Sequence, residues 1–210
     1  MRMNIDPKLM LSDDELQLAT NTGWILTKRR VMEKVDRLLG FIAEDQKRVI
    51  ENEKDWLPAE VVKSEPKIAR GENYLQLPYL MLDYPRCFDA ENIFAIRTMF
   101  WWGNFFSVTV HLSGKYKERF QEKIMINLSS VKENIFICIH ENQWHHHFEA
   151  DNYIAVKQLT NDELAALIKQ KQFIKLAIKL PLQPWAALPA LLENSFLEMI
   201  KLLKDQLPMR

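Results

Sequence analysis

The chain has 210 residues, of which 48% are hydrophobic and 27% charged, and this composition excludes an intrinsically disordered chain. Its 28 basic residues balance its 28 acidic ones, which excludes the overall positive charge that draws many proteins to nucleic acid. Acidic residues close to the start argue against an export signal, and the apolar stretches are too interrupted for a membrane span. The two cysteines lie far apart in the sequence and do not suggest a disulfide framework. We therefore expect a soluble, cytoplasmic protein with one α+β domain over residues 1–210.

Two helical segments are expected first. Residues 12–15, Ser-Asp-Asp-Glu, match the capping box, so a short helix should follow them and end or bend at Gly23. Apolar residues at helical spacing then predict an amphipathic helix over about residues 24–54. The basic run Lys28–Arg30 lies among acidic residues of this helix, and we interpret it as a solvated face rather than a phosphate contact.

The next segment mixes turn and strand signals. A connection with one short strand at Glu60–Lys63 is expected. Tyr74–Tyr84 has strand composition, but Pro78 cannot donate to a ladder, so this strand should lie at a sheet edge or carry a bulge. A turn at Tyr84–Cys87 should follow it.

The most apolar and aromatic stretch, Phe94–Leu112, predicts a β-hairpin around which the rest of the chain is organised. Gly103-Asn104 is typical of a two-residue turn, which would pair Trp102 with Phe105. Because side chains alternate along a strand, this register gives one core face. The core face would carry Ala95, Arg97, Met99, Trp101, Phe106, Val108, Val110 and Leu112. The other face would carry a mixed set, Phe94, Ile96, Thr98, Phe100, Trp102, Phe105, Ser107, Thr109 and His111.

The second half of the chain alternates helices and strands. Apolar residues at every fourth position predict a helix near residues 116–128, and a capping box at Thr160–Glu163 begins another. Strands are expected at Tyr153–Lys157 and Phe173–Leu180, and a last helix should begin near Pro189. The order of elements predicts an α+β fold. Its sheet should be mainly antiparallel, with about six or seven strands, and should be packed against helices that include long amphipathic N-terminal and C-terminal ones.

A second hairpin is expected over residues 135–149. A loop of two or four residues would place a thiol and three imidazoles on one face, namely Cys138, His140, His145 and His147. Zinc prefers thiolate and imidazole ligands, so this face is a candidate zinc site. A three-residue loop would instead bring in Trp144 and His146 and leave fewer ligands. The plainer alternative has exposed histidines at a hairpin tip and a buried, inert cysteine.

Arg97 lies on the expected core face, where a guanidinium needs a carboxylate or several carbonyl partners. Asp83, near the end of the preceding strand, is the expected partner in a structural ion pair. The functional alternative is a corner that recognises a carboxylate or phosphate through the arginine fork. No glycine-rich phosphate loop or Gly-x-Ser-x-Gly motif is present in the sequence, which argues against the nucleotide sites and serine hydrolases that use them.

The leading functional interpretation is a binding or interaction module that uses the mixed face of the first hairpin and needs no cofactor. Its expected ligand-binding residues are Arg97, Thr98, Trp102, Phe105, Thr109 and His111. The expected partner is a small molecule or a protein, rather than a membrane or a nucleic acid. The alternative is a small metal-dependent hydrolase built on the candidate zinc site. A third interpretation is a single-stranded nucleic-acid binder that uses the aromatic platform with Lys28, Arg29 and Arg30.

Overall fold

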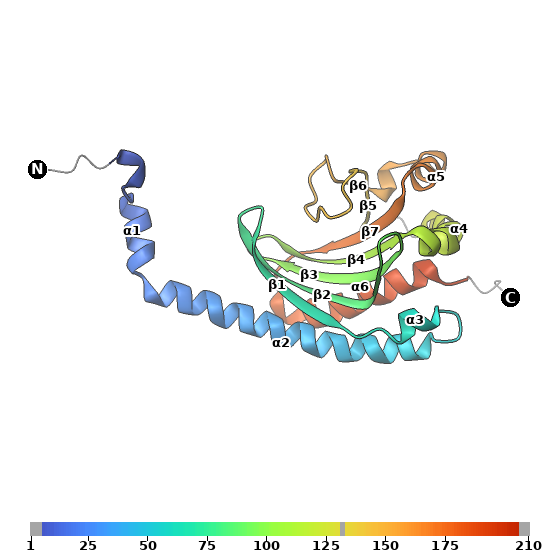
Figure 1. Cartoon of the computed structure of the whole chain (residues 1–210), viewed down its shortest axis with the longest axis horizontal. Helices are drawn as coiled ribbons and strands as arrows, with labels where there is room; N and C mark the ends of the chain where they lie inside the picture. The colour runs from blue at the N-terminus through green and yellow to red at the C-terminus, as the bar shows by residue number, and fades with distance from the viewer. Residues whose placement is uncertain (1–5, 131–132, 206–210) are drawn as a thin grey trace, which may run out of the picture.

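The computed structural model describes residues 6–130 and 133–205, and its centre is one β-sheet (Figure 1). Within these residues the sheet has seven strands in the order β1-β2-β3-β4-β7-β5-β6, and all neighbouring strands are antiparallel. They are β1 (Lys67–Tyr74), β2 (Leu77–Phe88), β3 (Ile93–Trp101), β4 (Phe105–Ser113), β5 (Ile135–Cys138), β6 (Tyr153–Ala155) and β7 (Phe173–Leu180). The expected α+β class and the size of the sheet are therefore confirmed.

The helices differ in how they begin, because only some of them have a capping side chain. The helices are α1 (Asp13–Thr20), α2 (Thr22–Asn52), α3 (Ala59–Val62), α4 (Gly114–Ser130), α5 (Asn161–Gln170) and α6 (Leu188–Leu203). Both expected capping boxes form, at the starts of α1 and α5. The prediction of a strand at Glu60–Lys63 is wrong. The carbonyl of Pro58 accepts the first backbone hydrogen bonds of a helix, so this segment forms α3 instead. In the described residues, none of the helices has a stretch long and apolar enough to cross a membrane.

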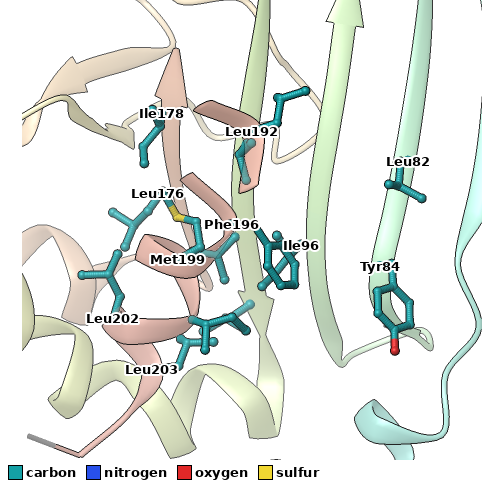
Figure 2. Packing of buried hydrophobic residues seen from close by; sticks show 14 of the residues in the cluster. Leu82, Tyr84, Ile96, Leu176, Ile178, Leu192, Phe196, Met199, Leu202 and Leu203 are labelled. Atoms are coloured by element: carbon teal, nitrogen blue, oxygen red, sulfur yellow. The ribbon is translucent and has the colours of Figure 1, made fainter. Parts of the chain in front are cut away.

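Helices α2, α4 and α6 cover one side of the sheet, which we call the helix face. Its apolar strand residues join the buried sides of these helices in one large core. Figure 2 shows Phe196, Met199 and Leu203 of α6 packed toward Ile96 of β3 and Leu176 of β7. Full burial of one large apolar side chain stabilises a fold by about 1.5–3 kcal/mol, so this layer fixes which side of each strand faces inward.

The first hairpin forms, but its expected register is wrong by one residue. Trp101 pairs with Phe105 and Arg97 with Thr109, so the loop has three residues, Trp102 to Asn104. Only Gly103 of these has a positive φ, of 72°, so a type I′ turn, which needs a positive φ at both central residues, is not formed. Phe94, Ile96, Thr98 and Phe100 therefore lie on the helix face, with the β4 residues Phe106, Val108, Val110 and Leu112. The opposite face carries Ala95, Arg97, Met99 and Trp101, with Phe105, Ser107, Thr109 and His111.

The prediction of a second hairpin over residues 135–149 is also wrong. Only Ile135–Cys138 forms the expected outgoing strand, and it pairs with β6 rather than with residues 145–149. Residues 139–152 form a loop without strand structure, which we call the covering loop. Local hydrogen bonds replace a ladder here, since the side chains of His140 and Asn142 accept backbone amides two residues ahead.

Pro78 is accommodated by an irregularity rather than by an edge position. Strand β2 is flanked by β1 and β3, and the β1–β2 register shifts between Gly71 and Tyr74, beside Pro78. The carbonyl of Pro78 accepts the Trp102 amide at 3.0 Å. This register shift agrees with the irregularity expected from the proline, and the expected turn at Tyr84–Cys87 is wrong because β2 continues through it.

Candidate functional site

The side of the sheet opposite to the helix face, which we call the loop face, is covered by the covering loop (Figure 1). Its middle is polar, with Asp83 of β2, Arg97 of β3, Thr109 and His111 of β4 and Lys175 of β7 on successive strands. Two apolar clusters flank this polar centre. One contains Met81, Met99, Trp101 and Phe105, the other contains Cys138, Tyr153, Phe173 and Ala177, and Phe148 of the covering loop packs against both.

Arg97 and Asp83 form a two-point ion pair. The guanidinium donates from Nε to Asp83 Oδ1 at 2.6 Å and from Nη2 to Asp83 Oδ2 at 2.9 Å. The third nitrogen, Nη1, lies 3.3 Å from Nε2 of His146 in the covering loop. Because its fork is already filled by a carboxylate, Arg97 has the geometry of the structural ion pair and not of an open anion corner.

Lys175 is a buried charge on this face, and no ionic partner contacts it among the described residues. It is only 1% exposed, and its ammonium donates to the backbone carbonyls of Gln143, at 3.0 Å, and His145. Among the described residues no carboxylate contacts it. Burial lowers the pKa of Lys175 to about 8, with Arg97 acting in the same direction, so the ammonium is largely charged at neutral pH.

His111 lies beside Lys175 across the β4–β7 ladder and is held neutral. Burial, together with the charges of Lys175 and Arg97, lowers the pKa of His111 to about 3. Its Nε2 lies 2.8 Å from Oε1 of Gln143, so the neutral imidazole donates this hydrogen bond. Burial and the same two cations also lower the pKa of His146 well below its usual value.

The covering loop is also anchored by Tyr74 of β1, by its own Asn152 and by Tyr153 of β6. The hydroxyl of Tyr74 accepts the amides of His146 and His147, at 2.6 and 3.1 Å. Asn152 donates to the carbonyl of His147 at 2.6 Å, and the ring of Phe148 stacks on Tyr153 with centroids 4.6 Å apart. These contacts hold the loop closed over the polar centre.

The structure brings together four of the six residues expected to bind a ligand. Arg97, Phe105, Thr109 and His111 share the loop face. Thr98 lies on the helix face, where it accepts from Gln46 of α2. Trp102 lies in the hairpin turn, with its ring 6.2 Å from that of Trp24 at 79°, so it packs on α2 instead of joining the others.

The four residues of the candidate zinc site do not converge. The ring centroids of His140 and His145 lie 4.3 Å apart, and those of His145 and His147 lie 5.3 Å apart. The thiol of Cys138, however, donates to Asn152 Oδ1 at 3.4 Å and to the His140 carbonyl. Across residues 6–130 and 133–205, no group of three or more His, Cys, Asp or Glu side chains is arranged to hold a metal ion.

Sequence reasoning missed Lys175 and the role of the covering loop. A signal for Lys175 was present, because Lys175 and Lys179 alternate with apolar residues in FIKLAIKL and so share one strand face. Comparison with models of known protein families, with curated proteins and with solved structures finds no match to this chain.

Proposed function

We propose that the chain is a binding protein for a small anion, which it holds between the loop face and the covering loop in contact with Lys175. The observation that carries this proposal is the buried ammonium without a carboxylate. Removing an ammonium from water costs several kcal/mol of free energy, and hydrogen bonds to two carbonyls offset only part of this cost. An anionic oxygen at the same position would supply both a hydrogen-bond acceptor and the missing charge.

The surrounding groups suit such a ligand. The neutral His111 and the hydroxyls of Thr109 and Tyr153 are hydrogen-bonding groups without negative charge, and Asp83 is already neutralised by Arg97. Carboxylate and phosphate ligands share the anionic oxygen that this arrangement favours. The Gln143 and His145 carbonyls occupy the positions that the ligand oxygens would take, so binding requires the covering loop to shift.

Thermal unfolding with added anions tests the proposal. We expect short-chain carboxylates or inorganic phosphate to raise the Tm of the wild-type chain above that in equal chloride, because a ligand that binds only the folded state stabilises it. Lys175→Met should abolish this increase. Lys179→Met is the matched control, because Lys179 is an exposed lysine on the same strand face and should leave the increase intact.

The control matters because phosphate stabilises many proteins without binding to a site. A wild-type increase that Lys175→Met retains would therefore be nonspecific and would contradict the proposal, as would no increase with any of these anions. Carboxylates and phosphate are measured separately, so the stronger response identifies the class of ligand.

A further inference from the structure

The N-terminal part of the chain extends away from the sheet as an arm, which we define as residues 6–30 (Figure 1). Helix α1 has no buried residue, and all of residues 6–27 are exposed. Eight of the large apolar side chains exposed in the described residues belong to this arm, namely Leu9, Met10, Leu11, Leu16, Leu18, Trp24, Ile25 and Leu26. Such a concentration is typical of an interaction surface, because isolated proteins rarely leave contiguous apolar surface uncovered.

The arm also separates its charges. Its distal helix, α1, begins with Asp13, Asp14 and Glu15, whereas the first turns of α2 carry Arg29 and Arg30. Glu15 is used by its own capping box, and Arg30 donates to Thr27. Within the described part of the chain, Asp14 and Arg29 make neither an ion pair nor a side-chain hydrogen bond.

Two of these charges share a helix face with an exposed apolar residue. Residues four apart on a helix lie on the same side, so Asp14 lies above Leu18 in α1, and Ile25 lies beside Arg29 in α2. Both Ile25, which is 48% exposed, and Arg29 are open to solvent, and burial of this side of α2 begins only about two turns after Ile25, at Met32.

We propose that the arm is a self-association surface in which two copies of this chain pair through antiparallel arms. Asp14 of one copy faces Arg29 of the second, and Leu18 faces Ile25. Both pairings have their midpoint between residues 21 and 22, where α1 ends and α2 begins. A two-fold axis at this junction therefore repeats every contact, as a symmetric dimer interface requires.

Charge favours a second copy as the occupant. An acidic or a basic partner would leave the charges at one end of the arm without opposite charges, whereas an antiparallel copy places opposite charges at both ends. An anionic lipid surface would attract Arg29 and Arg30 but repel the acidic first turn of α1.

Charge reversal tests the pairing in the full-length chain. Sedimentation equilibrium over a range of concentrations should show a monomer–dimer equilibrium for the wild type. Asp14→Arg and Arg29→Glu should each weaken the dimer by about tenfold, because each places like charges at both symmetric contacts. The double variant Asp14→Arg/Arg29→Glu should restore the dimer, and mixing the two single variants should give a heterodimer.

Lys34→Glu is the matched control, since it changes an exposed lysine of α2 outside the arm and should leave the equilibrium unchanged. The variants should keep the wild-type circular dichroism spectrum, because Asp14 and Arg29 are exposed. A wild type that remains monomeric, or a dimer that is insensitive to both single variants, would overturn the pairing. Binding of the monomer to anionic vesicles through the arm would overturn it in favour of a membrane.

Discussion

Asp83→Asn is expected to lower the free energy of unfolding by about 3–5 kcal/mol, because it leaves the Arg97 guanidinium without its carboxylate. The Arg97 side chain is 11% exposed and that of Asp83 is 14% exposed, so water cannot fully replace the lost partner. The effect should reach the covering loop, because the same guanidinium lies beside His146.

Denaturant unfolding of Asp83→Asn, Arg97→Met and the double variant measures the coupling within this pair. The double variant should lose less stability than the two single losses added together, since it leaves no unpaired charge. If Asp83→Asn costs below about 1 kcal/mol, the pair behaves as a surface ion pair and the description of the polar centre is wrong.

Acidification from pH 6.5 to pH 5 is expected to cost about 2 kcal/mol of stability through His111 alone. The pKa of His111 in the folded chain, about 3, lies below its usual value of 6.5, so the unfolded chain binds a proton in this range and the folded chain does not. The contribution of His111 is therefore complete above pH 6.5 and is lost as the pH falls toward 3. His146 acts in the same direction because burial lowers its pKa too.

The covering loop should be the first part to respond to acid, because both imidazoles lie beneath it or within it beside the cations Arg97 and Lys175. The test is the slope of the free energy of unfolding against pH, measured for the wild type and for His111→Gln. The variant should have a shallower slope between pH 6.5 and 5, and His140→Gln controls for the loss of a histidine elsewhere in the loop. Equal slopes for the wild type and His111→Gln would contradict the burial of a neutral His111.

Elements with local signals were predictable from the sequence. The capping boxes at Ser12 and Thr160 fix the starts of α1 and α5, because each pattern satisfies backbone amides within four residues. Phe173–Leu180 alternates cleanly and forms a strand with the expected bounds. In these segments the information needed to choose the structure lies within the segment itself.

The register of the first hairpin was not predictable from turn preference alone. Phe94–Trp102 is apolar at nearly every position, so either side of β3 suits a core, and one residue of shift exchanges its two faces. The neighbours make the choice, since Trp102 packs against Trp24 of α2 and Arg97 pairs with Asp83 on the loop face. The sequence did contain one signal for the observed register. Alternate residues of β4 are polar, namely Ser107, Thr109 and His111, and the observed register places Arg97 on the same side as these polar residues.

The candidate site was harder to predict because its parts come from distant segments. The ammonium of Lys175 is placed by β7, its two carbonyl partners belong to the covering loop, and Tyr74 of β1 anchors that loop. No spacing within one segment encodes these contacts. The histidines of the loop suggested a metal from their residue type, whereas the structure uses His146 in the Arg97 contact and His147 in the hydrogen bond with Tyr74.

The most direct test of the central claim is an NMR titration of the Lys175 side-chain nitrogen, with and without the anion that stabilises the chain most. The account predicts a pKa of about 8 for Lys175 in the free chain, and a clear rise toward the usual 10.5 when the anion is bound, because a neighbouring negative charge favours the ammonium. An ordinary pKa in the free chain that the anion does not change would contradict the claim that Lys175 is a buried charge awaiting an anion.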